Sequence, residues 1–313
     1  ERKWALWPIV PLHQAAVLFG PGGSAKSTLA VYFAVLVQGG IVAKGLRPTQ
    51  TNVAYLDWET DEDTVNDTCW GISHALNLAT PVVPFYRRCY RPLDVEMEGL
   101  QELIADKHVG MVIVDSAMPA AGSTKDAKEQ GGNLIPTLRA LGVSSLIVAH
   151  VTKNPLGGAS PYGDVFLTNL ARHVVEIKAT RVLGENALDL ALFNPKTNMG
   201  PLRPPLAYRM RWDADGGIAV HDQDANQLEV VQDRQTVKQR LYALLQAQPR
   251  TIAELAAEVD PKAENEKGRK LQDSIAATLR KSPWAVNVGN DKQEAGRGSQ
   301  GRWAIAAKEA ELY

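Results

Sequence analysis

The chain has 313 residues, 45% hydrophobic and 22% charged, which excludes collagen-like, low-complexity and wholly disordered chains and suggests about two domains. Its 34 basic and 35 acidic residues leave a net charge of −1, so adhesion to nucleic acid or membrane by bulk charge alone is also excluded. No apolar run approaches the ~20 residues of a membrane-spanning helix, and Cys69 and Cys89 are too few for a disulfide framework. We therefore expect a cytoplasmic protein without a membrane partner.

Apolar runs alternate with helical patterns along the first half of the chain. The runs MVIV (111–114) and SLIVA (145–149) are uninterrupted, as in strands buried on both faces of a parallel sheet. Later runs have hairpin character, so we expect an α/β domain over residues 1–221 with a mainly parallel sheet and an antiparallel extension. The expected strands are 15–19, 52–57, 82–86, 111–114, 145–149, 174–178, 188–193, 208–212 and 217–220; the expected helices are 26–37, one starting at 61–63, 95–105 and 134–141.

The last part of the chain differs in charge from the rest. Residues 232–313 carry 14 basic and 11 acidic residues, whereas the preceding 231 carry 20 and 24. The polar stretch 222–233 is the expected linker. Beyond it, helices at 237–245, 252–259 (capped by Thr251, with Glu254 completing a capping box) and 267–279 precede strands at 284–288 and 302–306. This order predicts a winged helix-turn-helix domain over residues 234–313, whose third helix would enter the major groove of DNA; protein binding is the open alternative.

The strongest chemical signal is GPGGSAKST at residues 20–28, between an expected strand and an expected helix. This is the context of a P-loop, in which backbone N–H groups and a helix N-terminus surround phosphates. Lys26 would reach the β- and γ-phosphates of ATP, and Ser27 would ligate Mg²⁺. Ala25 replaces the second consensus glycine and would resist a positive φ. The predicted nucleotide-binding residues are Gly20, Pro21, Gly22, Gly23, Ser24, Ala25, Lys26, Ser27 and Thr28.

Carboxylates follow two of the expected strands. Asp115 ends MVIV, where a Walker B aspartate would hold Mg²⁺ through water. Asp57 and Glu59 end the strand after the P-loop helix, and a spacing of two would put both side chains on one face of an extended chain. A carboxylate there can orient and deprotonate the attacking water. An N-cap cluster is the alternative role of the acidic residues 61–63.

Taken together, residues 7–212 resemble the RecA-type ATPases, in particular the hexameric replicative helicases typified by the plasmid RepA helicase. The resemblance implies that Glu59 is the catalytic glutamate, ending the strand beside the P-loop strand. It also implies that His150, with Lys153 three residues on, senses the γ-phosphate. Arg172 in TNLARH resembles the family's arginine finger, which completes a neighbour's site, and Lys196 in NPKTNMG is a candidate second finger.

The resemblance further implies a ring of six subunits that draws single-stranded DNA through its channel. Residues 118–132 and 153–164 are expected to be the channel loops, with Lys125, Lys128 and Lys153 as DNA contacts. The predicted function is that of an ATP-hydrolysing DNA-dependent motor, a RepA-like helicase. The open alternative is a nucleotide-gated DNA-binding protein or loader that does not unwind DNA.

Overall fold

The computed structural model describes residues 3–122, 127–151, 164–232, 237–260, 265–283, 285–289 and 301–306. The chain divides into two units, Glu1–Leu228 and Glu229–Tyr313. The division falls inside the stretch expected as a linker. That stretch contains the last residue of a strand, a 3-10 helix (Ala225–Gln227) and the short helix α7 (Glu229–Gln232).

A nine-stranded mixed sheet forms the centre of the first unit. Its strands β3, β8, β7, β5 and β6 are parallel, β9 pairs parallel with β3, and β9 to β12 are antiparallel. The expected α/β class, with a mainly parallel sheet and an antiparallel extension, is confirmed. In sheet order the strands are β12 (Ile218–Asp222), β11 (Leu206–Trp212), β10 (Ala187–Thr197), β9 (His173–Arg181), β3 (Ala15–Gly20), β8 (Ser144–His150), β7 (Val109–Asp115), β5 (Asn52–Asp57) and β6 (Phe85–Arg88).

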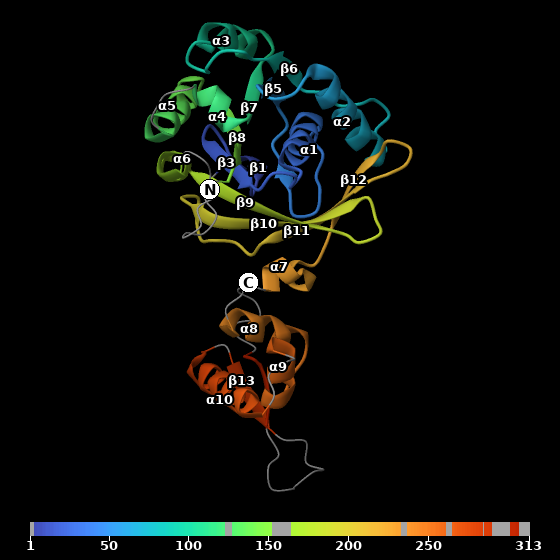
Figure 1. Cartoon of the computed structure of the whole chain (residues 1–313), viewed down its shortest axis with the longest axis vertical. Helices are drawn as coiled ribbons and strands as arrows, with labels where there is room; N and C mark the ends of the chain where they lie inside the picture. The colour runs from blue at the N-terminus through green and yellow to red at the C-terminus, as the bar shows by residue number, and fades with distance from the viewer. Residues whose placement is uncertain are drawn as a thin grey trace. The chain divides into compact units, whose positions relative to one another are not determined.

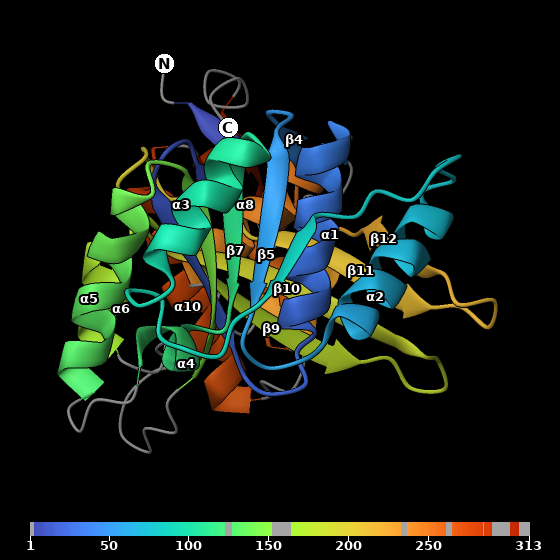
Figure 2. The same cartoon turned by 90° about the horizontal axis from the view of Figure 1, so that it is seen from above.

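Helices cover both faces of the parallel part of the sheet, as Figures 1 and 2 show. Successive side chains of a strand point to opposite faces, so each strand contributes to two separate cores. Helix α1 lies in one core and α3, α4 and α5 contribute to the other. The helices are α1 (Lys26–Gly39), α2 (Glu62–Ala75), α3 (Met97–Asp106), α4 (Ala117–Ala121), α5 (Ala127–Ala140) and α6 (Asp164–Leu170).

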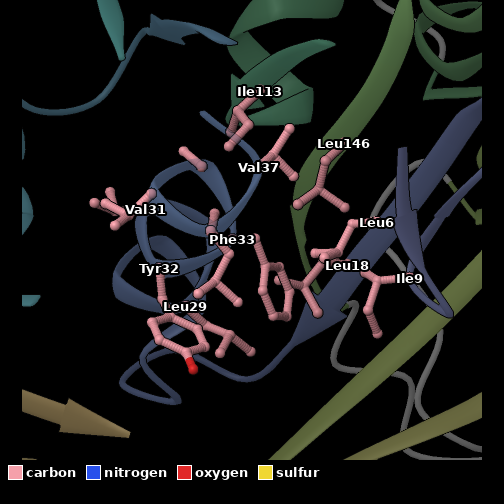
Figure 3. Packing of buried hydrophobic residues seen from close by; sticks show 14 of the residues in the cluster. Leu6, Ile9, Leu18, Leu29, Val31, Tyr32, Phe33, Val37, Ile113 and Leu146 are labelled. Carbon is pink, nitrogen blue, oxygen red and sulfur yellow. The ribbon is translucent and has the colours of Figure 1, made fainter. Parts of the chain in front are cut away.

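Helix α1 is apolar around most of its circumference. Ten of its residues are buried, namely Lys26 and residues 29–37. A helix of this kind must be enclosed on several sides. Here it packs on the sheet, on α2 and on β1. Figure 3 shows this packing, with Phe33 facing Leu18 of β3 and Leu6 of β1. The core therefore fixes the helix whose first turn carries the lysine and hydroxyl groups of the P-loop.

A three-stranded antiparallel sheet was not predicted. It consists of β2 (Val10–Pro11), β1 (Trp4–Trp7) and β4 (Arg47–Pro48). Its strands have two to four residues each, too few for an alternating pattern to be visible in the sequence. Leu6 and Val10 are fully buried, so the small sheet closes one side of the core around α1.

Three expectations about the first unit are wrong. The strand expected at 82–86 is β6 at Phe85–Arg88, because Pro84 precedes the paired residues. The expected channel loop 118–132 contains most of α4 and the start of α5, so its described part is largely helical. Strand β5 does not lie beside the P-loop strand β3, because β8 and β7 lie between them. The other expected channel loop, with Lys153, and Lys125 lie outside the described residues, as does the side chain of Lys128.

The second unit contains three helices followed by an antiparallel hairpin. The helices are α8 (Val237–Ala247), α9 (Ile252–Val259) and α10 (Asn265–Lys281), and the strands are β13 (Ala285–Gly289) and β14 (Arg302–Ile305). The predicted capping box is present, since Thr251 Oγ1 accepts from the Glu254 N–H and Glu254 accepts from the Thr251 N–H. Trp303 of β14 packs with Leu241, Leu255 and Ile275. The element order is the expected one, and assignment to the winged-helix fold stays a prediction.

Across the part of the chain that the structure describes, no helix has the length and apolarity needed to cross a membrane.

Candidate nucleotide-hydrolysis site

Most of the expected site residues converge at the carboxyl edge of the parallel strands. Gly20 of β3 is aligned with His150 of β8, and Asp57 of β5 is aligned with Asp115 of β7. Carboxyl ends of parallel strands meet at one edge of a sheet, and ligands of open α/β sheets bind there. The P-loop, both aspartates, Glu59 and His150 therefore face one region although up to 130 residues separate them.

The P-loop backbone includes two positions that favour glycine. A Cβ atom on Gly20 would lie 2.4 Å from Ile177 Cγ2 of β9, so only glycine fits there. Gly23 has a φ of +73° with open space around it. Ser24 Oγ and Lys26 Nζ both donate to the Pro21 carbonyl, each at 2.8 Å. Lys26 must exchange this bond for phosphate oxygens when a nucleotide binds.

Ala25 adopts the left-handed conformation that the sequence predicted it would resist, with φ 56° and ψ 31° at the N-cap of α1. The loop therefore keeps its path, and the alanine is strained by about 1–2 kcal/mol. We expect Ala25→Gly to raise the free energy of unfolding by about 1 kcal/mol, as measured by urea denaturation. Ala34→Gly, in the middle of α1, should lower it by a similar amount or more. An equal decrease in the free energy of unfolding of both variants would contradict the strain at Ala25.

The ammonium of Lys26 is buried, and burial and nearby carboxylates have opposite effects on its pKa. Burial lowers its pKa, while the carboxylates of Asp115 and Glu59 act in the opposite direction. The side chain is 5% exposed, so a bound phosphate would meet a largely desolvated cation. Charge interactions are stronger in such surroundings than in water.

Asp115 has one carboxylate oxygen engaged and one without a protein partner. Tyr55 OH donates to Oδ2 at 2.6 Å, whereas the buried Oδ1 accepts no hydrogen bond. Burial raises the pKa of Asp115, and the nearby hydroxyl groups of Tyr55 and Ser27 partly oppose the rise. A buried carboxylate oxygen without a partner, next to a serine hydroxyl, fits a Mg²⁺ ion that keeps several of its waters. No cluster of three metal-ligating side chains occurs among the described residues, and a P-loop magnesium site does not need one.

Asp57 and Glu59 do not share a face, contrary to expectation. Asp57 is fully buried, and its Oδ1 accepts the N–H groups of Glu59 and Thr60 at 2.8 and 2.9 Å. Its Oδ2 accepts from Thr60 Oγ1 and Tyr86 OH and lies 3.4 Å from Arg88 Nη1. Burial raises the pKa of Asp57, but these hydrogen bonds outweigh it and the pKa is lowered. The chain turns around this carboxylate, so Asp57 holds the segment that carries Glu59.

Glu59 projects toward the P-loop side of the edge. Its Oε1 accepts a hydrogen bond from Ser116 Oγ and lies 3.6 Å from His150 Nε2. The side chains of Glu59 and His150 are 40% and 48% exposed, so water can reach both. The Glu59 carboxylate also raises the pKa of Lys26, against the larger opposite effect of burial. An accessible carboxylate in this position can accept a proton from an attacking water.

Arg172 and Lys196 lie away from this edge. The Arg172 N–H donates to the carbonyl of Ala15, the first residue of β3, at 3.0 Å. Five residue steps, roughly 16 Å at about 3.3 Å each, separate Ala15 from Gly20. Arg172 is exposed at the amino edge of the sheet and is not brought to the P-loop of its own chain. Lys196 Nζ donates to carbonyls at the end of α6, including those of Asn169 and Ala171 at 2.8 and 3.0 Å, which does not support its role as a free second finger.

Sequence reasoning missed three side chains that organise the site: Ser116, Tyr55 and Tyr86. Ser116 directly follows Asp115, and Tyr55 lies two residues before Asp57 and therefore on the same strand face. Both signals were present in the sequence. Tyr86 could not be found in this way, because its contact with Asp57 depends on the pairing of β5 with β6.

The strand order, the P-loop and the Asp115 carboxylate define a P-loop nucleoside-triphosphatase domain. Residues 1–155 match a family model described as an AAA domain. This part of the chain is thus similar to the P-loop ATPase domains of that family, a class that uses a nucleoside triphosphate and typically Mg²⁺.

No curated protein matches the chain. Among solved structures, the chain is similar to the KaiC-like protein PH0186 from the hyperthermophilic archaeon Pyrococcus horikoshii OT3. The two are 14% identical with a TM-score of 0.49, and the match covers 71% of this chain and 99% of that one. A likeness at this level adds no argument about function.

Proposed function

We propose that the protein is a DNA-dependent ATPase motor that acts on single-stranded DNA as a ring, in the manner of a RepA-like replicative helicase. The observation that carries the ATPase part is the arrangement of Asp115 and Glu59. Asp115 has a buried oxygen free for a metal, and Glu59 is exposed to water 3.6 Å from His150 Nε2. The motor part is supported by the exposed position of Arg172 at the opposite edge of the sheet.

In the proposed reaction, water attacks the γ-phosphate of ATP and the bond to the β-phosphate oxygen breaks. Bound Mg²⁺ would supply neutralising charge to the phosphates, with Ser27 and Asp115 holding it. Lys26 stabilises charge on the phosphate oxygens, and Glu59 accepts the proton of the attacking water. Ser116 orients the Glu59 carboxylate through its hydrogen bond, and the proposed role of His150, 3.6 Å from Glu59, is to sense the γ-phosphate.

An arginine at the amino edge can complete a hydrolysis site only in another subunit. We therefore expect Arg172→Ala and Glu59→Gln each to be inactive, and mixtures of the two to recover part of the ATPase activity. In a mixed ring, an Arg172→Ala subunit keeps its Glu59 and receives Arg172 from a Glu59→Gln neighbour. ATP turnover is measured as a function of the mixing ratio. Absence of recovery at every ratio would contradict the role in trans.

The second unit supports a DNA partner less strongly. Helix α10 and the β13–β14 hairpin border an open cavity of about 400 Å³. Its lining includes Arg280, Gln272 and Asn287, but also the carboxylate of Asp273. Such a mixed lining suits hydrogen bonding to base edges or to a protein surface, so the proposal does not depend on this unit.

The test of the motor is ATP turnover with and without single-stranded DNA, together with strand displacement on a forked duplex. We expect DNA to stimulate turnover and unwinding to require hydrolysis. Light scattering with an ATP analogue and DNA reports whether a ring forms. Binding of DNA that depends on ATP, without stimulated turnover or unwinding, would instead identify a nucleotide-gated binding protein or loader.

A further inference from the structure

An indole flanked by two arginines lies apart from the nucleotide site, on the small three-stranded sheet. Trp7 and Arg47 are directly paired residues of β1 and β4. The Arg47 guanidinium carbon lies 5.1 Å from the centroid of the Trp7 ring, and that of Arg203, from the β10–β11 connection, lies 4.7 Å from it. Three segments that are distant in sequence thus bring two cations to one aromatic ring.

No carboxylate in the described part of the chain neutralises these arginines. Among the described residues, neither guanidinium lies within 4.0 Å of an acidic side chain, although ion pairs occur elsewhere in the same unit. Both arginines are exposed, and Trp7 is half-buried. His173, which lies close enough for Arg203 to affect it, adds no charge at neutral pH, because burial and that arginine lower its pKa to about 4. The surface therefore has two unneutralised cations in a unit with an excess of acidic residues.

The shape of this region indicates where a ligand would lie. The cavity beneath Arg203 and Pro8 has a volume of about 20 Å³, which is close to that of one water molecule. A ligand must therefore lie across the arginines on the outside. Planar guanidinium groups form forked hydrogen bonds to phosphate oxygens, and their faces can also stack on bases. Basic groups combined with an aromatic ring are typical of surfaces that follow single-stranded nucleic acid.

We propose that Trp7, Arg47 and Arg203 form a binding surface for the phosphodiester backbone of single-stranded nucleic acid. The choice of polynucleotide over other anions rests on the proposed function. Trp7 holds the two guanidinium groups in place by cation–π contact, and each of them binds one phosphate. Because the overall charge of the protein is near zero, such a local surface is needed for salt-sensitive binding.

The test is fluorescence anisotropy of a labelled single-stranded oligothymidylate between 50 and 200 mM salt, with the full chain and an ATP analogue present. Each phosphate contact on single-stranded nucleic acid contributes about 0.7 to the slope of log K against log salt. We expect Arg47→Ala and Arg203→Ala each to reduce the slope by about 0.7, and the double variant by about 1.4. The matched control is Arg181→Ala. Arg181 is exposed and lies at the end of β9 opposite His173, so its replacement should leave the slope unchanged.

Lysine variants separate charge from stacking. Arg47→Lys with Arg203→Lys should retain the slope and weaken binding about two- to fivefold, because the ammonium lacks the planar contact with Trp7. Wild-type binding with an unchanged slope in the double alanine variant would overturn this surface but not the motor. Absence of single-strand binding by the wild type in any nucleotide state would overturn both. Competition by inorganic phosphate at concentrations equivalent to the oligonucleotide's phosphates would reassign the surface to free anions and overturn the proposal.

Discussion

Glu59→Gln is expected to lower the rate of ATP hydrolysis about 10²- to 10⁴-fold while leaving ATP binding intact. Glutamine has the same shape and can still accept the hydrogen bond from Ser116, but its amide cannot take a proton from water. Nucleotide binding depends on the P-loop and Asp115, which the substitution does not touch. Single-turnover hydrolysis and fluorescent-nucleotide titration measure the two properties separately.

Two controls accompany this variant. Glu62→Gln removes an exposed carboxylate only three residues away, in the first turn of α2, and should leave hydrolysis unchanged. Lys26→Ala should lose nucleotide affinity as well as turnover, because the proposed role of this buried cation is to contact the phosphates directly. If Glu59→Gln retained hydrolysis within about threefold of the wild type, the proton would have to go to another group, and the assignment of Glu59 would be wrong.

Acidification between pH 6.5 and about 4 is expected to destabilise the protein by about 3 kcal/mol through His173. Burial, and the nearby Arg203, lower the pKa of this histidine from 6.5 to about 4. A base whose pKa is lower in the folded state binds protons more readily when unfolded. Its contribution is therefore intact above pH 6.5 and is lost as the pH falls toward 4.

Hydrogen bonds explain why the neutral ring is preferred. Asn194 Nδ2 donates to the carbonyls of Val174 and Lys196, so its donor end faces His173 Nε2 at 3.3 Å. That nitrogen must accept, which leaves Nδ1 to donate to Thr197 Oγ1 at 3.0 Å. A proton on Nε2 would face the amide donor of Asn194 in a buried place.

The measurement is urea denaturation of the wild type and His173→Gln at several pH values between 7 and 4. The free energy of unfolding of His173→Gln should change less with pH than that of the wild type, whatever its value at pH 7, because the variant cannot take up this proton. His221→Gln, an exposed histidine of β12, should keep the wild-type dependence. Parallel curves for His173→Gln and the wild type would show that another group controls the acid response. Protonation of Asp57 destabilises the protein separately, at pH values below its ordinary pKa of 3.8, because its pKa is lowered in the folded state.

The sequence by itself determined the class of the ATPase domain and the centre of its site. The P-loop is contiguous, and its neighbouring strand and helix have patterns that are visible locally. Asp115 follows an uninterrupted apolar run, and buried parallel strands must have such runs because both of their faces are covered. These features depend on residues close together in the chain, so they could be predicted before the fold was known.

Only the tertiary structure decided how the site is held together. Asp57 and Glu59 have the spacing of a shared strand face, but the hydrogen bonds at Asp57 turn the chain and separate their roles. Arg172 lies at the amino edge of the sheet because β9, which follows it, pairs parallel with β3. The sequence pattern does not reveal this pairing. The proposed binding surface brings together Trp7 of β1, Arg47 of β4 and Arg203 of the β10–β11 connection. Contacts of this kind depend on which segments pair in space, and local patterns carry no signal for them.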